Sequence, residues 1–295
     1  MTLEKFHGTT TALITPFNED ESVNYEGYKQ NLDAQIEGGV NGLLVLGTTG
    51  ETPTLTNEEQ IELIKITVEK GKASGVPVMV GVGTNNTKTT VENSKLAEEL
   101  GADALLVVTP YYNKPTNGGI MAHFTAVNDA VNTPIVVYNI AGRTGKNIDT
   151  KTMKELAKLS NVEAVKEASG DINQMMDVIR EIPDLTVLSG DDGITCPLMA
   201  MGGKGVISVA SNVFPKLVSD MTTALLDEDY ETGRNMHYEL MPLFSGLFME
   251  TNPLPVKTAM GMVGLNGGAF RLPMTPMQDD NIPKLQALID YYKQR

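Results

Sequence analysis

The most constraining feature of this sequence is an alternation, repeated eight times, of short β-branched runs with segments of helical periodicity. Strands that alternate with helices are typical of a parallel sheet, because a crossover segment must carry the chain back between parallel strands. Eight such units predict an α/β protein of the (β/α)8 TIM-barrel class, with a doubly wound open sheet as the alternative. The runs lie near residues 11, 44, 79, 106, 136, 164, 187 and 207 and read TTALI, GLLVLG, VPVMVGVG, ALLVV, PIVVYN, VEAVKEA, LTVLSG and GVISVA.

Helix signals between these runs divide the chain into two parts. In TNEEQIELIKITVEK, Thr56 and Glu59 have the spacing of a capping box, which predicts that a helix starts there. TTVENSKLAEELGA ends at Gly101, as expected at a helix terminus. From about residue 225 onward only helical segments follow. We therefore expect a catalytic barrel over residues 1–224 and a C-terminal helical extension over residues 225–295.

Charge and composition exclude several classes of function. The formal net charge of −14 disfavours nucleic acid or an anionic membrane as a partner. No uncharged apolar run approaches the roughly 20 residues of a membrane span, and no signal peptide is evident, so we expect a cytoplasmic protein. The single cysteine, Cys196, is expected to be a small buried helix residue. The three histidines lack the spacing of a metal site, and we expect neither a metal nor a cofactor.

A lysine interrupts the sixth β-branched run, VEAVKEASG. By strict alternation Lys166 shares a face with Val162 and Ala164, which would direct its ammonium group into a core. Burial lowers the pKa of a lysine, and the neutral amine can then attack a ketone or aldehyde to form a Schiff base. The alternative is an ordinary ion pair with a neighbouring carboxylate such as Glu163, Glu167 or Asp171.

The carboxyl ends of the other strands add groups that suit such chemistry, because the active site of a barrel lies at this rim. Tyr138 and Thr48 could relay the protons that imine formation requires, and Arg143 suits the bidentate grip of a carboxylate. Each residue alone has an ordinary structural interpretation. Together with Lys166 they indicate a metal-free aldolase.

The motifs GTTGE, TPYYNKP, YNIAGRTG, VKEASGD, LSGDD, GVISV, NPLPVK and RLPMTP, in this order, closely resemble those of the dihydrodipicolinate synthase family of pyruvate-dependent Schiff-base aldolases. The resemblance runs from about residue 8 to 276. It implies a (β/α)8 barrel with a helical extension, assembled as a homotetramer that is a dimer of dimers. It also implies the condensation of pyruvate with L-aspartate 4-semialdehyde, the first committed step of diaminopimelate and lysine biosynthesis.

The resemblance further implies four catalytic residues. Lys166 would form the imine with pyruvate, and Tyr138 would act beside it as general acid and base. Thr48 would link Tyr138 to Tyr112, which in this family reaches in from the neighbouring subunit.

Four binding residues are implied in the same way. Thr49 would hold the pyruvate carboxylate through its backbone amide and hydroxyl, and Arg143 would receive the carboxylate of the semialdehyde. Gly190 and Ile207 would line the pyruvate pocket through backbone groups.

The chain departs from the family pattern at three positions. Relatives commonly have proline at the position of Ala141, in the loop before Arg143. Lysine-inhibited relatives have histidine and glutamate at the positions of Asn57 and Thr89, although Asn85 and Tyr111 match. We therefore expect weak or absent feedback inhibition by lysine.

Two other functions compete with this interpretation. An N-acetylneuraminate lyase or a keto-deoxy-sugar-acid aldolase would share Lys166 and Tyr138, but such enzymes tend to have serine at the position of Thr48 and to lack Arg143. A non-catalytic binding barrel would not need this combination of side chains.

Overall fold

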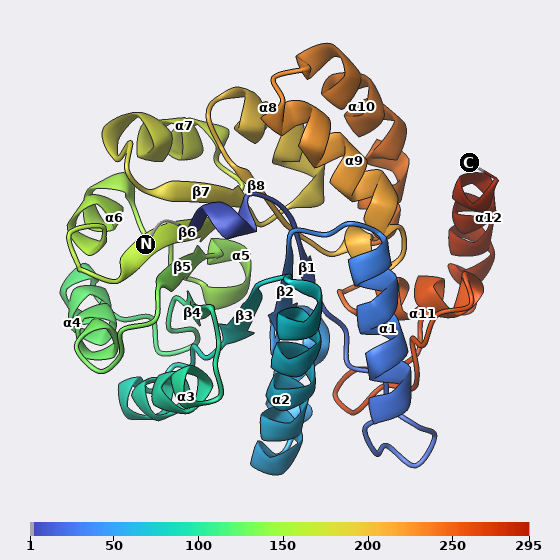
Figure 1. The fold of residues 1–295 in the computed structure, drawn as a ribbon, viewed down its shortest axis with the longest axis horizontal. Helices are drawn as coiled ribbons and strands as arrows, with labels where there is room; N and C mark the ends of the chain where they lie inside the picture. The colour runs from blue at the N-terminus through green and yellow to red at the C-terminus, as the bar shows by residue number, and fades with distance from the viewer. Residues whose placement is uncertain (1–2, 295) are drawn as a thin grey trace.

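Eight parallel strands close into a barrel in sequence order, from β1 to β8, in the computed structural model, which describes residues 3–294 (Figure 1). The closed sheet confirms the predicted fold class and excludes the open doubly wound alternative. Each predicted run contributes one strand. The strands are β1 (Gly8–Ala12), β2 (Gly42–Val45), β3 (Val78–Gly81), β4 (Ala104–Val108), β5 (Ile135–Asn139), β6 (Val162–Glu167), β7 (Thr186–Ser189) and β8 (Gly205–Ser208).

Helices surround the barrel and then continue beyond it (Figure 1). The helices up to the end of the barrel are α1 (Tyr25–Glu37), α2 (Asn57–Ser74), α3 (Thr87–Glu99), α4 (Asn117–Asn128), α5 (Ala141–Thr144), α6 (Thr150–Leu156), α7 (Ile172–Glu181), α8 (Thr195–Ala200) and α9 (Pro215–Leu226). The extension comprises α10 (Tyr230–Gly246), α11 (Leu254–Met262) and α12 (Ile282–Lys293). The capping box at the start of α2 is confirmed, with both the Thr56 and the Glu59 side chains bonded to backbone amides.

Apolar side chains pack both inside the barrel and between its strands and the outer helices. Leu44, Met79 and Val136 belong to the cluster inside the barrel, and the 3-10 helix η1 (Leu3–Phe6) adds Leu3 and Phe6 to it. A second cluster lies between the strands and the outer helices. The barrel is therefore a packed core, so chemistry is confined to its rim.

The extension has its own apolar cluster, which it shares with the last part of the barrel. Helix α10 packs against α8 and α9, and α12 packs against α10 and α11. Cys196 lies buried in α8, as expected.

The start of β6 differs from the alternation expected from the sequence. Ile135 pairs with Val162 but the next residue, Val136, pairs with Ala164, so the register shifts by one residue at this point. Val162 consequently packs in the cluster between strands and helices, whereas Ala164 packs inside the barrel. The prediction that Val162 shares a face with Lys166 was wrong, because a bulge interrupts the period of two.

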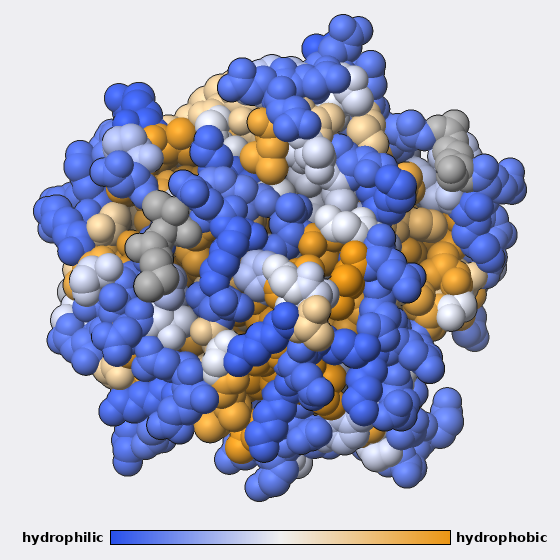
Figure 2. Space-filling model, viewed as in Figure 1, coloured by the Kyte–Doolittle hydropathy of each residue, from blue (hydrophilic) through white to orange (hydrophobic). Residues whose placement is uncertain are grey.

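The outer surface carries mainly polar side chains. Figure 2 shows a largely hydrophilic face, on which hydrophobic residues gather in the gaps between helices. Within residues 3–294, no helix is long and apolar enough to cross a membrane.

Candidate active site at the barrel rim

Lys166 lies near the carboxyl end of β6, next to Tyr138 on β5. The two residues are paired in the sheet register, and the Lys166 Nζ lies 4.3 Å from the centroid of the Tyr138 ring. Both side chains are buried, with 7% of Lys166 and 6% of Tyr138 exposed. None of the three carboxylates considered from the sequence forms an ion pair with Lys166 within the residues that the structure describes.

The surroundings of Lys166 favour its neutral amine. Burial lowers the pKa of Lys166 to about 7; the Asp192 carboxylate opposes this effect and the Arg143 guanidinium adds to it. A large fraction of the amine is therefore neutral near pH 7, compared with about 0.04% for an unperturbed lysine. Burial also raises the pKa of Tyr138 to about 12, while Arg143 acts in the opposite direction. Tyr138 thus remains protonated and able to donate a proton.

Asp192 is a buried carboxylate at this rim whose influence on Lys166 was missed from the sequence. It lies in the 3-10 helix η4 (Asp192–Ile194), is 2% exposed, and accepts hydrogen bonds from the amides of Val209 at 3.0 Å and Ala210 at 3.1 Å. Burial raises the pKa of Asp192, and these hydrogen bonds oppose the rise. The sequence places Asp192 at the rim, in the LSGDD segment after the seventh strand, but nothing local in that segment shows an effect on Lys166.

A cavity of about 470 Å³ opens at the same rim and brings three predicted residues together. Thr48, Tyr138 and Arg143 line it, and Tyr111 contributes to its wall. Arg143 lies in the short helix α5 that directly follows β5, which explains how an exposed cation comes to the mouth of the cavity. An anionic substrate would therefore meet a cation at the entrance. Lys166 does not itself line this cavity, but it lies beside Tyr138, which does.

Gly190 lies beside Lys166, and Ile207 lies inside the barrel. A Cβ atom added at Gly190 would stand 3.1 Å from Lys166 Cε and 2.8 Å from Ala168 Cβ, so a side chain there would crowd the amine. Gly190 also lines a second cavity, of about 510 Å³, between the rim and α10. Ile207 is 1% exposed and packs in the barrel interior.

Tyr112 does not join this group within one chain. Its side chain is 88% exposed, it does not line the cavity, and its backbone has a positive φ of 69°. A single chain therefore supplies Lys166, Tyr138, Thr48 and Arg143 but leaves Tyr112 pointing elsewhere.

Residues of the C-terminal extension contact the GTTGE turn, which the sequence did not predict. Thr49 is 3% exposed, and its hydroxyl accepts a hydrogen bond of 2.9 Å from the Asn252 side chain. Lys257 forms an ion pair of 2.5 Å with Glu51, and both side chains are almost fully buried. The motif NPLPVK contains Asn252 and Lys257, but nothing local in it identifies partners some 200 residues earlier.

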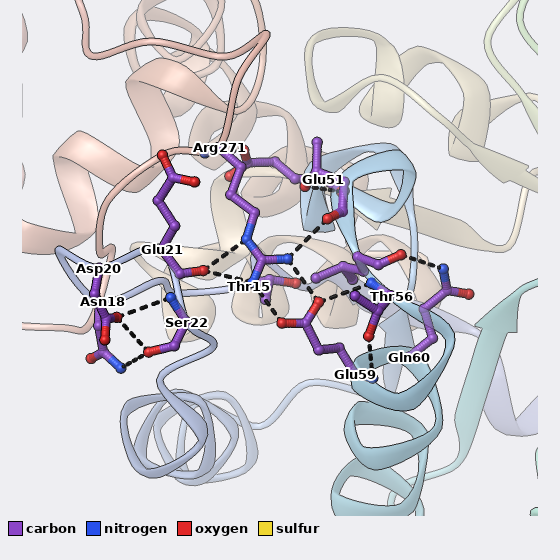
Figure 3. A network of polar contacts seen from close by, with 12 residues as sticks. Thr15, Asn18, Asp20, Glu21, Ser22, Glu51, Thr56, Glu59, Gln60 and Arg271 are labelled. Carbon is purple, nitrogen blue, oxygen red and sulfur yellow. Dashed lines mark hydrogen bonds and ion pairs between the residues drawn. The ribbon is translucent and has the colours of Figure 1, made fainter.

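Arg271 extends this network to the start of α2 (Figure 3). Its backbone amide donates to Glu51, and its guanidinium forms two hydrogen bonds with the Glu59 carboxylate, at 2.5 and 2.7 Å. The same guanidinium donates to the carbonyl of Glu21. The turn that carries Thr48 and Thr49 is thus fixed by three segments that are distant in sequence.

Comparisons with known proteins show which family this chain belongs to. The sequence profile of the Dihydrodipicolinate synthetase family matches residues 5–292. The chain belongs to this family. A relative from Thermoanaerobacter sp., named 4-hydroxy-tetrahydrodipicolinate synthase, is 47% identical over 289 residues, which cover 97% of each chain. A relative of the same name from Methanosarcina mazei is 45% identical over 282 residues, 95% of this chain and 96% of its own.

A solved structure shares the whole architecture. The dihydrodipicolinate synthase of Aquifex aeolicus superposes with a TM-score of 0.95 at 43% identity and covers 98% of both chains. Membership of the Dihydrodipicolinate synthetase family agrees with the resemblance found in the motifs. The barrel and its helical extension are therefore features of the family as well as of this chain.

Proposed function

We propose that this chain is a 4-hydroxy-tetrahydrodipicolinate synthase, a lyase that condenses pyruvate with L-aspartate 4-semialdehyde through a Schiff base on Lys166. This reaction is the first committed step of diaminopimelate and lysine biosynthesis. The relatives that cover almost the whole chain bear this name, which favours the synthase over an N-acetylneuraminate lyase or a keto-deoxy-sugar-acid aldolase. We also propose a cytoplasmic location, in keeping with a role in amino-acid biosynthesis.

The observation that carries the proposal is a buried lysine with a pKa of about 7 beside a buried tyrosine. The neutral amine of Lys166 attacks the ketone carbon of pyruvate, and loss of water gives the imine. The protonated imine nitrogen then draws electrons from a C–H bond of the methyl group next to the imine carbon. A methyl proton leaves, and an enamine forms. Tyr138 stands next to the amine, where it can give and take the protons of these steps.

The second substrate meets the enamine at the rim. The enamine carbon attacks the aldehyde of L-aspartate 4-semialdehyde, and the amino group of that substrate then displaces Lys166 from the imine carbon to close the ring. Thr49 would hold the carboxylate of pyruvate, and Arg143, exposed at the mouth of the cavity, would hold that of the semialdehyde. Gly190 and Ile207 would complete the pyruvate pocket beside Lys166.

A substrate comparison tests this function. Pyruvate should be consumed when L-aspartate 4-semialdehyde is added and should persist when N-acetylmannosamine replaces it. Consumption only with N-acetylmannosamine would assign the chain to the sugar-acid branch of the family.

We propose that the enzyme works as a homotetramer, a dimer of dimers, in which Tyr112 enters the site of a neighbouring copy. The 88% exposure of Tyr112 and its positive φ suit a side chain that contacts another subunit. Tyr112→Phe should lower kcat by about two orders of magnitude, because a proton relay through its hydroxyl would be lost, while the circular dichroism spectrum stays unchanged. Unchanged turnover would show that Tyr112 takes no part in proton transfer.

Weak lysine feedback is the expected consequence of Asn57 and Thr89. Asn57 has no charge and Thr89 no carboxylate, so a lysine ligand would lack the groups that the inhibited pattern provides. Initial rates measured with increasing L-lysine should therefore stay close to the uninhibited rate at submillimolar concentration. Strong inhibition in that range would contradict this prediction.

A further inference from the structure

Asn252 makes a buried contact between the C-terminal extension and the barrel rim. It lies in the turn between α10 and α11 and is 6% exposed. Its Nδ2 donates to the hydroxyl oxygen of Thr49 at 2.9 Å. Its Oδ1 is buried without a partner among residues 3–294, so the bond to Thr49 is the one polar contact that orients this side chain.

This contact fixes how the Thr49 hydroxyl can be used. A hydroxyl has one proton to donate and two lone pairs that accept. Because the Asn252 amide already occupies a lone pair, the Thr49 proton is free for another acceptor. A ligand group that can only accept, such as a carboxylate, matches a hydroxyl prepared in this way.

The backbone of the same turn is held independently of Asn252. The hydroxyl of Thr15, just beyond β1, donates to the carbonyl of Gly50 at 2.8 Å, and Lys257 pairs with Glu51 on the extension side. These contacts fix the path of residues 49–51. Asn252 is therefore not needed to fix the backbone of the turn, and its hydrogen bond orients only the Thr49 hydroxyl.

We infer that Asn252 is a positioning residue of the enzyme: it holds the Thr49 hydroxyl as a hydrogen-bond donor toward the carboxylate of bound pyruvate. The extension thereby takes part in substrate binding without touching the substrate. This inference rests on the proposed function, because it requires pyruvate at Thr49.

Asn252→Ala and Asn252→Asp test the inference by removing or reversing the hydrogen bond. Asn252→Ala should raise the KM for pyruvate about tenfold with a much smaller change in kcat, because loss of a hydrogen bond to a charged ligand is worth about 1.4 kcal/mol or more. Asn252→Asp should raise KM further, because a carboxylate accepts the Thr49 proton and repels the pyruvate carboxylate. An unchanged KM in Asn252→Ala would overturn the inference even if Asn252→Asp fails to fold.

Two comparisons separate positioning from general structural damage. In a Thr49→Val background, Asn252→Ala should cause no additional rise in KM, because the hydroxyl it orients is absent; additive losses would contradict the inference. With acetone, which has no acceptor group in place of the carboxylate, borohydride trapping should proceed equally in the parent and in Asn252→Ala, and an equal loss with both ketones would also contradict the inference.

Asn266→Ala is the matched control. Asn266 joins the extension to α1: its backbone pairs with the Asn31 side chain, and its side-chain amide donates to Gln30. Asn266→Ala removes only the bond to Gln30, so this variant should keep the parent KM. A rise equal to that of Asn252→Ala would mean that any loosening of the extension has this effect, which overturns the inference. Trapping of pyruvate by the parent protein is measured first. If the parent forms no adduct, the proposed function fails. If the parent forms the adduct and Asn252→Ala keeps the parent KM, only the role of Asn252 is refuted.

Discussion

Replacing Lys166 by alanine is expected to lower kcat on the order of 10³-fold or more. The reaction passes through a covalent intermediate on this amine, so the variant loses the group that forms the imine. Lys166 also packs between the Tyr138 ring and the backbone of Gly190. An amine on any other side chain would not occupy this position. Steady-state rates of pyruvate consumption measure the effect.

Lys204→Ala provides the control for this variant. Lys204 is exposed and immediately precedes β8, at the end of the barrel opposite to the rim, so its replacement should leave kcat unchanged. Retention of more than a tenth of the activity in Lys166→Ala would contradict a covalent role for this lysine.

The same amine should set the pH dependence of pyruvate capture. The reactive form is the neutral amine, and the pKa of Lys166 is about 7, so kcat/KM for pyruvate should fall about tenfold per pH unit below this value and level off above it. Asp192 raises the pKa of Lys166, so Asp192→Asn should move this fall to lower pH. A move to higher pH would show that the charge of Asp192 acts in another way.

Replacing Lys257 by methionine is expected to lower the free energy of unfolding by about 3–5 kcal/mol, because Glu51 would be left buried without its cation. Lys257 is 1% exposed, pairs with Glu51 at 2.5 Å and donates to the carbonyl of Ala269 at 2.6 Å. Its ammonium also lies 4.6 Å from the centroid of the Phe17 ring and 4.7 Å from that of Phe270. Urea unfolding followed by circular dichroism measures the loss.

A surface ion pair supplies the comparison for Lys257. Lys216 and Asp220 are joined at 2.8 Å, with 74% and 43% of their side chains exposed, so Lys216→Met should cost less than about 1 kcal/mol. Adding Glu51→Gln to Lys257→Met should recover part of the lost stability, because the unpaired charge is removed. A loss in Lys257→Met no larger than that in Lys216→Met would show that the buried pair contributes little.

The fold could be predicted from the sequence because its signals are local. Each strand is a short apolar run and each helix carries its own start or stop, as the capping box of Thr56 and Glu59 illustrates. The local bulge in β6 was not predictable in this way, because it depends on how β5 pairs with β6. The bulge places Val162 on the face of β6 that packs against the outer helices, whereas Lys166 keeps its position beside Tyr138.

The candidate site could be predicted only where a residue follows directly from a strand. Tyr138, Lys166 and Arg143 stand on or just after strand ends, so the rim rule of a barrel found them. Asn252 and Lys257 belong to the extension, and their partners lie in the GTTGE turn, which no local pattern reveals. Tyr112 is 88% exposed in the single chain, so its expected place in the site of a neighbouring copy stays a prediction.

Borohydride trapping shows whether Lys166 forms a Schiff base with pyruvate. The protein is incubated with pyruvate, reduced, digested and mapped by mass spectrometry, with a sample without pyruvate as the control. A reduced pyruvate adduct is expected on the peptide that contains Lys166, and none in the control. The absence of an adduct, or an adduct on a different lysine, would contradict it.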